Sequence, residues 1–263
     1  MGLLDGRVLV TGATGGIGTA IARAFAARGA NLVLTGRRED VLLSLADELR
    51  AQPIVCDFAD RPEVERLLAQ AGEVDVLVAN AGLPGAGALT DFSQAQLDRI
   101  LDVNVRAPIA LARSLVPGMI ARGAGHLVFM SSLNGRIASP LTSVYSATKF
   151  ALRGFALGLR QDLRGYGVGV SVVMPGFVSE AGMFADTGVK LPPGMGTRSP
   201  GEVAAAVVRA IEHNRTEVDV APLGVRLGAA IGGAAPGLAA SATRLARGEQ
   251  VAAEIAAGQR KKL

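Results

Sequence analysis

The stretch YSATK, from Tyr145 to Lys149, places a phenol and an ammonium four residues apart in a segment with helical apolar spacing. A four-residue step on a helix rises about 6 Å and returns to nearly the same face, so both groups can flank one small site. A free tyrosine has a pKa of about 10, and a cation within about 4 to 6 Å lowers that value. The pair could therefore exchange a proton with a ligand. The competing interpretation is structural, because the same segment has a core-facing stripe of Leu152, Phe155, Leu159 and Leu163.

A glycine-rich turn near the start of the chain is the second candidate site. An apolar strand leads into TGATGGIG, from Thr11 to Gly18, and then into a helical pattern. At such a turn backbone N–H groups point outward at a helix N-terminus, and missing side chains let a pyrophosphate approach closely. Glycine is abundant, 34 of 263 residues, so a plain tight turn is the alternative. The strand, turn and helix in this order favour dinucleotide binding through Gly12, Gly16 and Gly18.

The end of the second apolar strand indicates which dinucleotide is bound. An acidic residue there would bind the adenosine ribose hydroxyls and repel a 2′-phosphate, whereas arginine would pair with that phosphate. The chain reads LTGRRED, with Gly36 where the acid would stand, followed by Arg37 and Arg38. These residues favour NADP(H), while NAD(H) is also possible.

The elements that must position these groups alternate regularly along the chain. Short runs rich in Val, Leu and Ile are separated by longer segments with helical spacing, as in a parallel sheet covered by helices on both faces. We therefore expect one α/β domain over residues 1–263, a doubly wound and mostly parallel seven-stranded sheet of the Rossmann type. The expected strands are Arg7 to Thr11, Asn31 to Leu34, Ile54 to Cys56, Val74 to Ala79, His126 to Met130, Val168 to Met174 and Val218 to Val220.

Two segments outside this pattern have their own predicted roles. Residues 177–198 are rich in Gly and Pro without a clear period, which predicts a substrate lid. SPGE follows, with Ser199 as N-cap and Glu202 completing a capping box. Residues 221–263 form a C-terminal helical cap or tail. They include the uncharged run from Leu227 to Thr243, which is short for a membrane span and contains Pro236, so we expect a cap or oligomer contact, with peripheral membrane contact as the alternative.

Composition excludes several other classes of protein. The net charge is +4, the basic residues are dispersed and aromatic residues make up 4%, which argues against nucleic-acid binding. A single Cys and two His predict neither a disulfide framework nor a metal site. The first residues pass into a strand without the pattern of a signal peptide, so we expect a cytoplasmic protein without an integral membrane segment.

Six motifs in sequence order make the chain resemble the short-chain dehydrogenase/reductase family, in its single-domain group. The resemblance covers roughly the first 180 residues. It rests on the glycine motif Thr11 to Gly18, Asp57, Asn80-Ala81-Gly82, Asn104, Ser132 thirteen residues before Tyr145, and Pro175-Gly176.

The resemblance implies catalytic roles for four residues. Tyr145 would exchange the proton of the substrate hydroxyl, and Ser132 would bind the carbonyl oxygen, with the neighbouring Ser131 as its less favoured rival. Lys149 would bind the nicotinamide ribose and lower the pKa of Tyr145, and Asn104 would hold a water that links Lys149 to solvent. The implied cofactor contacts are Gly12, Thr14, Gly16, Ile17, Gly18, Arg37, Arg38, Asp57, Asn80, Ala81, Gly82, Tyr145, Lys149, Pro175, Gly176 and Val178.

The chain departs from the family pattern at two positions. Ala79 stands where many members have the first Asn of Asn-Asn-Ala-Gly, and Glu180 stands where a Thr usually binds the nicotinamide carboxamide. Ser179 is a possible substitute for that Thr, and the Glu180 carboxylate would disfavour anionic substrates.

The expected function is an oxidoreductase that transfers a hydride between NADP(H) and a neutral lipophilic ketone or secondary alcohol, since the lid is apolar. A non-catalytic dinucleotide sensor, or a lyase or isomerase on the same scaffold, are the alternatives. The family resemblance and a small-residue helix face of Ala151, Gly154 and Gly158 also predict a homodimer or homotetramer.

Overall fold

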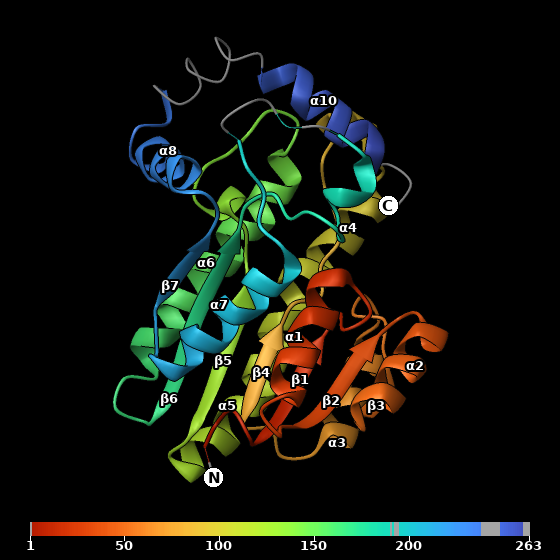
Figure 1. Ribbon diagram of the computed structural model, residues 1–263, viewed down its shortest axis with the longest axis vertical. Coiled ribbons are helices and arrows are strands. Elements are labelled where there is room, and N and C mark those ends of the chain that lie inside the picture. The colour runs from red at the N-terminus through yellow and green to blue at the C-terminus, as the bar shows by residue number, and fades with distance from the viewer. Residues whose placement is uncertain (1, 190, 192–194, 238–247, 260–263) are drawn as a thin grey trace.

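Strands and helices alternate along the computed structural model, which describes residues 2–189, 191, 195–237 and 248–259 (Figure 1). The strands are β1 (Arg7–Thr11), β2 (Asn31–Gly36), β3 (Gln52–Val55), β4 (Val76–Ala79), β5 (Gly125–Met130), β6 (Val168–Pro175) and β7 (Glu217–Val220). The α-helices are α1 (Gly16–Ala26), α2 (Glu39–Leu49), α3 (Arg61–Ala71), α4 (Gln94–Leu101), α5 (Ala107–Arg122), α6 (Ser143–Asp162), α7 (Pro200–Glu212), α8 (Leu223–Ala234) and α10 (Gly248–Gln259). Short helical turns are η1 (Leu89–Asp91), η2 (Asp102–Arg106), η3 (Leu133–Gly135) and η4 (Ala185–Thr187).

The seven strands form one sheet in the order β3-β2-β1-β4-β5-β6-β7, and every pair in it is parallel. The predicted Rossmann sheet is confirmed, and each predicted strand is present with its ends within two residues of the expected ones. The chain leaves β1 in one direction toward β2 and β3, and later returns on the other side through β4. In such sheets ligands bind outside the carboxyl ends of the strands, at the point where the strand order reverses. This point lies between β1 and β4.

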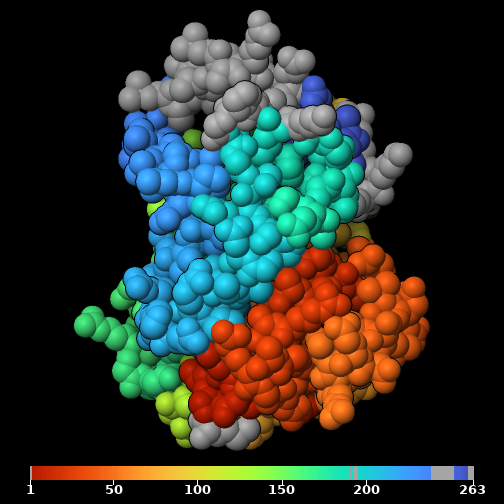
Figure 2. All heavy atoms as spheres, in the orientation of Figure 1, coloured from red at the N-terminus to blue at the C-terminus, as the bar shows by residue number. Residues whose placement is uncertain are grey.

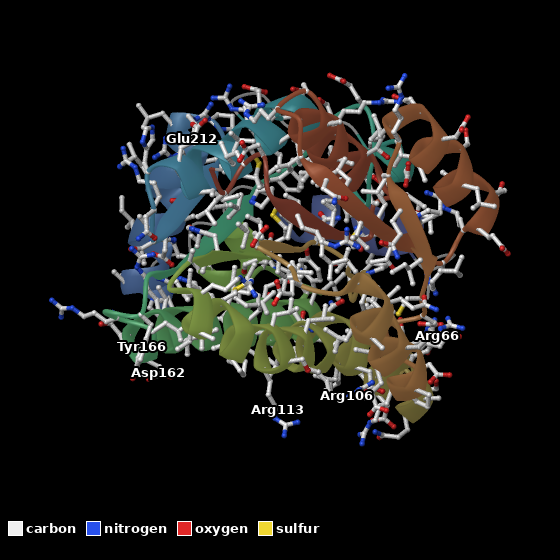
Figure 3. The ribbon with its side chains drawn as sticks, turned by 90° about the horizontal axis from the view of Figure 1, so that it is seen from below. Arg66, Arg106, Arg113, Asp162, Tyr166 and Glu212 are labelled. Carbon is white, nitrogen blue, oxygen red and sulfur yellow. The ribbon has the colours of Figure 1, made fainter. Side chains whose placement is uncertain are left out.

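Helices cover both faces of the sheet, and Figure 3 shows the two layers of helices on either side of it. One core contains side chains from α1, α2 and α7, and the other contains side chains from α3, α4, α5 and α6. The central strands β5 and β6 are buried along their whole length, which explains why they read as nearly continuous apolar runs. The apolar strands are therefore packed between two cores, which fix the positions of their carboxyl ends.

The capping box predicted at SPGE starts α7. The Ser199 hydroxyl accepts a hydrogen bond from the Glu202 N–H at 3.2 Å, and the Glu202 carboxylate accepts from the Ser199 N–H at 2.8 Å. These bonds satisfy backbone donors that the first turn of a helix leaves without partners. They also end the predicted lid at a defined residue.

The segments η4, α8 and α10 lie beyond the carboxyl ends of the strands, at the top of the molecule in Figure 1. Helices α8 and α10 belong to the predicted C-terminal cap, and η4 belongs to the predicted lid. Of these predicted segments, residues 190, 192–194, 238–247 and 260–263 lie outside the described part of the chain. Within that part, none of the helices combines the length and the apolar character needed to span a bilayer.

A buried histidine joins β5 to β6, and its partners explain why it is neutral. The Ser171 hydroxyl donates to the Arg215 carbonyl oxygen at 2.5 Å, so it accepts from His126 Nε2, which lies 2.8 Å away. Burial, and to a smaller extent the nearby charge of Arg160, lower the pKa of His126 to about 4. A proton on His126 would therefore place a charge in a dry part of the core.

We expect the free energy of unfolding to fall as the pH drops from about 7 to about 4, by up to about 3 kcal/mol from His126 alone. The unfolded chain binds this proton near the ordinary pKa of 6.5, whereas the folded chain binds it only near 4, so acid favours the unfolded state. His126→Gln keeps a donor for Ser171 and does not titrate. Urea unfolding at several pH values should show a smaller loss for this variant. An identical pH dependence in both proteins would contradict the assignment.

Candidate active site

The glycine turn connects β1 to α1 and has no room for side chains. Gly12 has a φ of +64°, a conformation that favours glycine. A Cβ on Gly18 would collide with the Gly12 carbonyl oxygen, and a Cβ on Gly16 would collide with Ala181 of the lid. Helix α1 has no side-chain cap and no acidic residue in its first turn. Its free N–H groups and the bare backbone therefore fit a phosphate group of a dinucleotide.

Residues 80–82, after β4, hold this turn in place from the neighbouring strand. The Thr11 hydroxyl accepts hydrogen bonds from the N–H groups of Asn80 and Ala81, both at 2.9 Å. The Asn80 amide donates in return to the carbonyl oxygens of Thr11 at 2.9 Å and Gly12 at 3.3 Å. These four bonds join β1 and β4 at the point where the strand order reverses. The Asn80 side chain therefore supports the glycine turn through the protein backbone.

A cavity of about 1260 Å³ runs along the carboxyl ends of the strands. Every catalytic and cofactor residue predicted from the sequence lines it, except Asn104. The cavity continues from the glycine turn past Arg37 and Asp57 on one side and to Tyr145 and Lys149 on the other. Its extent and its bare glycine floor fit a bound dinucleotide.

The end of the cavity at β2 and β3 contains the residues predicted to choose the coenzyme. A Cβ on Gly36 would lie 2.9 Å from the Thr14 hydroxyl oxygen, so Thr14 fills the space of an acidic side chain. Arg37 and Arg38 are exposed, and the Arg38 guanidinium donates to the Thr14 carbonyl oxygen. This end of the cavity therefore offers cations and lacks the acid at position 36.

Asp57 is held by an arginine from α4 that sequence reasoning missed. Arg99 Nη2 lies 2.7 Å from Asp57 Oδ2, and the Ala59 N–H donates to Oδ1 at 3.0 Å. Burial raises the pKa of Asp57, but the hydrogen bonds from Arg99 and Ala59 and the charges of Arg99 and Arg37 outweigh it, so the pKa lies below its ordinary value. The carboxylate is therefore ionised and its orientation is restrained.

Ser132, Tyr145 and Lys149 come together at the other end of the cavity. Ser132 follows β5 and caps η3, and its hydroxyl donates to the Pro175 carbonyl oxygen at 3.3 Å. Lys149 Nζ lies 5.5 Å from the centre of the Tyr145 ring and donates to the Met130 carbonyl oxygen at 2.9 Å. The helical spacing thus places the phenol and the ammonium side by side, as the sequence predicts. The neighbouring Ser131 is buried and donates to the Lys149 carbonyl oxygen, which fixes the helix rather than a ligand.

Asn104 lies in the π-helical turn η2 between α4 and α5, and it is buried. Its side-chain oxygen accepts from the Leu83 N–H at 2.7 Å, and its side-chain nitrogen donates to the Leu83 carbonyl oxygen at 3.0 Å and to the Thr148 hydroxyl at 3.2 Å. The side chain therefore joins the loop after β4 to helix α6. It positions Gly82 and Lys149 on either side of the cavity.

The model of the short chain dehydrogenase family matches residues 7–190, which contain all of these motifs. The chain belongs to the short-chain dehydrogenase family. It is 39% identical over 222 residues to Ketoacyl reductase HetN of Nostoc sp., covering 81% of this chain and 77% of that protein. As a family member it is an NAD(P)-dependent oxidoreductase.

Two solved short-chain dehydrogenase structures have the same fold. The short-chain dehydrogenase from Sphingobium yanoikuyae in complex with NADPH superposes with a TM-score of 0.76 at 27% identity, over 88% of this chain and 94% of that one. The bulky-bulky ketone specific alcohol dehydrogenase from Comamonas testosteroni gives a TM-score of 0.72 at 27% identity, over 81% of this chain and 85% of that one.

The pKa of Tyr145 in this family member moves in the direction opposite to the one expected from the sequence. Burial raises it to about 12, and a hydrogen bond with Ser132 lowers it only in part. Burial also lowers the pKa of Lys149 to about 8. The expectation considered the attraction between the two groups and omitted desolvation, which opposes the charged form of each. Tyr145 is therefore a protonated phenol at neutral pH.

The lid places Glu180 differently from the sequence-based expectation. Glu180 has a φ of 67°, its side chain is exposed, and it does not line the cavity. The expectation of a carboxylate near the substrate was wrong, because the Glu180 side chain is exposed outside the cavity lining. The hydroxyl of Ser179, the suggested substitute for the missing Thr, donates to the Arg198 carbonyl oxygen at 3.4 Å.

Another lid residue reaches the catalytic groups instead. A Cβ on Gly82 would lie 3.7 Å from Lys149 Nζ and 3.8 Å from Met183 Cε, so Met183 and Lys149 both approach the backbone of Gly82. The Met183 carbonyl oxygen accepts from Gln259 of α10 at 3.4 Å. Described residues of α10 and of the segment 177–198 thus line the same cavity. The sequence alone does not reveal this contact, because Gln259 is distant from Met183 in the chain.

Removing the Thr11 hydroxyl should weaken coenzyme binding, because the N–H groups of Asn80 and Ala81 would lose the acceptor that joins them to β1 and the glycine turn would lose its support. For Thr11→Val we expect NADPH to bind roughly tenfold more weakly, measured by fluorescence titration. Thr11→Ser retains the hydroxyl and is the matched control, with binding close to wild type. Equal affinities in all three proteins would show that the turn does not depend on this bond.

Proposed function

We propose that this short-chain dehydrogenase interconverts a neutral lipophilic ketone and its secondary alcohol with NADP(H). The observation that carries the proposal is the meeting of Ser132, Tyr145 and Lys149 at the end of a cavity whose floor is the glycine turn. This arrangement suits the reduction of a carbonyl group. Tyr145 is an acid that keeps its proton, Ser132 is a hydroxyl beside it, and Lys149 is a buried cation.

Each catalytic group has a distinct role in this proposal. Bound NADP(H) supplies the hydride. Ser132 donates a hydrogen bond to the carbonyl oxygen of the substrate in place of Pro175. Tyr145 gives its proton to the same oxygen, and its raised pKa keeps that proton available at neutral pH. In the reverse direction Tyr145 must lose a proton, and a charged Lys149 beside it favours that step.

Lys149 has N–H donors beyond the one that Met130 uses, and we assign these to the hydroxyls of the nicotinamide ribose. The side chain of Asn104 is fully engaged by Leu83 and Thr148, so the water proposed for Asn104 would bind to its main-chain carbonyl. A π-helical turn at this position is consistent with such a role, since π turns occur often at functional sites.

The preference for NADP(H) is supported by the arginines at the end of β2. Arg37 lines the cavity and lies close enough to Asp57 to lower its pKa, which places its charge near the adenosine end. Position 36 has no acid to repel a 2′-phosphate. The similar Sphingobium enzyme is named as a complex with NADPH, which agrees with this assignment.

The substrate half of the cavity supports a neutral and apolar ligand. It is lined by Leu133, Ile137, Met183, Val225 and Ile255. Among the described residues, the charged side chains that line the whole cavity are Arg37, Arg38, Asp57, Lys149 and Asp186. Among the residues that the structure describes at the substrate end, Lys149 is the cation that lines the cavity. The names of the Nostoc ketoacyl reductase and the Comamonas bulky-ketone enzyme fit a ketone with a large apolar body.

Assembly into a homodimer or homotetramer is part of the proposal. Gly154 and Gly158 of α6 are positions where an added Cβ would meet nothing within 4 Å, so this helix face is open to another surface. The exposed Phe150 lies one turn before Gly154 and offers an apolar contact. Light scattering at micromolar concentration measures the mass, and a monomer would contradict this part.

We also retain a cytoplasmic location in the proposal. Cys56 is buried, and burial raises the pKa of its thiol to about 12, so it is not reactive. A protein whose one cysteine is unreactive forms no disulfide and does not require an oxidising compartment. Cell fractionation tests the location.

Replacing Tyr145 by Phe removes the proton donor and keeps the ring. We expect kcat to fall by about 10² to 10⁴, while the dissociation constant for NADPH stays near the wild-type value. Tyr166→Phe is the matched control, because Tyr166 is the other tyrosine of the chain and points away from the protein (Figure 3). Following NADPH absorbance with a ketone substrate measures the rate. Wild-type turnover in Tyr145→Phe, or substrate conversion without oxidation of NADPH, would contradict the mechanism.

Coenzyme choice should depend on Arg37. Wild-type kcat/KM with NADPH should exceed that with NADH, and Arg37→Asp should reduce the NADPH value by roughly 10- to 100-fold, as expected for lost hydrogen bonds to a charged group. The value with NADH should stay constant or rise, which separates a lost phosphate contact from a damaged protein. A wild-type preference for NADH would refute this assignment.

The apolar cavity predicts how turnover changes with substrate size. Across a series of ketones that differ by one methylene, kcat/KM should rise by about two- to fourfold per step, since each buried methylene contributes about 0.8 kcal/mol at most. A ketone of the same length that ends in a carboxylate should react at least tenfold less well. If the smallest or the anionic ketone reacts best, the lipophilic substrate is wrong.

A further inference from the structure

Helix α8 has two apolar faces that meet different surroundings. Val225 and Ala229 line the cavity on its inner face. On its outer face Leu223, Leu227 and Ile231 are exposed by 66%, 55% and 63%. Residues spaced by four lie on nearly the same side of a helix, so these three side chains form one stripe. We call this stripe the α8 outer face.

The position of the α8 outer face links it to the cavity. Figure 2 shows α8 at the surface, at the end of the molecule that lies beyond the carboxyl ends of the strands. Met195 of the lid is also exposed, by 39%, and lines the cavity. Apolar side chains therefore lie on the outer surface of α8 and, with Val225 and Met195, also on the wall of the cavity.

The charge of this region indicates what the stripe contacts. Arg226 is the sole charged residue of α8. In the described residues from Ala221 to Gly237 there is no Asp or Glu, and the charged residue is Arg226. An apolar stripe on a helix that carries this exposed cation complements a bilayer surface that has anionic lipids. A second copy docked by the same face would bring like charges together, which disfavours self-association there.

We propose that the α8 outer face docks on an anionic lipid bilayer and that a lipophilic substrate passes from the bilayer into the cavity beside α8. The contact is interfacial, because no helix of the described residues is long and apolar enough to span a bilayer. The docking itself rests on the α8 outer face alone. The route of the substrate rests on the proposed function.

Vesicle binding of the full-length protein tests the docking without any substrate. The wild type should cosediment with vesicles of phosphatidylcholine and phosphatidylglycerol in equal amounts, and much less with vesicles of phosphatidylcholine alone. Leu227→Ser/Ile231→Ser should weaken the partition by about tenfold or more, because two large aliphatic side chains no longer enter the interface. Arg226→Gln should weaken it by about fivefold and mainly on the anionic vesicles.

Matched controls separate docking from general surface changes. Leu43→Ser, at a leucine of α2 that is 49% exposed, and Arg28→Gln, at an exposed arginine near the end of α1, should leave vesicle binding unchanged. Turnover of a water-soluble ketone should be the same in all variants, since none of these side chains lines the cavity. Turnover of a long-chain ketone supplied in anionic vesicles should fall in the double α8 variant and to a smaller extent in Arg226→Gln, and should stay at the wild-type value in the two controls.

The outcomes distinguish this proposal from the proposed function. Absence of wild-type cosedimentation, or equal loss in the α2 control, overturns the docking even if ketones are reduced. A lower mass of the double α8 variant in light scattering, without wild-type vesicle binding, assigns the stripe to a second copy and also overturns it. Vesicle binding that depends on α8 with no ketone reduction would support the docking and refute the proposed function.

Discussion

The hydroxyl of Thr11 is the contact on which the site depends. It accepts the N–H groups of Asn80 and Ala81, and so it joins the end of β1 to the end of β4 where the strand order reverses. At this point the backbone must approach a phosphate, so neither strand can use a bulky side chain to hold the other. A small hydroxyl and the amide of Asn80 satisfy the buried donors and acceptors in the available space. The floor of the cavity stays open because these two small groups make the contacts between the strands.

Burial has opposing effects on the catalytic pair of α6. The same packing that brings Tyr145 and Lys149 to one side of the helix removes both from water. It raises the pKa of the phenol to about 12 and lowers the pKa of the ammonium to about 8. Desolvation is the largest cause of both shifts, because it disfavours the charged form of each group. The site is prepared to give a proton, which agrees with carbonyl reduction.

The end of the molecule beyond the strands is built differently from the sheet. The sheet is held by continuous apolar strands and two layers of helices, whereas beyond the strands Gln259 of α10 is joined to Met183 by a polar bond. Apolar side chains therefore face both the cavity and the outside of α8. The sheet and its helices therefore determine the fold, and the segments beyond the strands contribute the walls of the cavity.

The sequence by itself determined the elements and the local pairs. Continuous Val, Leu and Ile runs predicted seven buried strands, SPGE predicted the start of α7, and the four-residue step predicted that Tyr145 and Lys149 share a face. These features depend on neighbours in the chain, and local periodicity is enough to reveal them. The resemblance to a known family supplied the roles of the predicted site residues, which periodicity alone could not.

Only the tertiary structure decided the contacts between distant residues. The bond of Thr11 to Asn80 spans 69 positions, and that of Arg99 to Asp57 spans 42, so neither follows from local pattern. The outward position of Glu180 depends on a left-handed turn, and the raised pKa of Tyr145 depends on how many atoms surround the phenol. Burial and backbone direction are properties of the packed chain. For that physical reason the sequence predicted which groups meet in the site, while the fold determined their protonation and their partners.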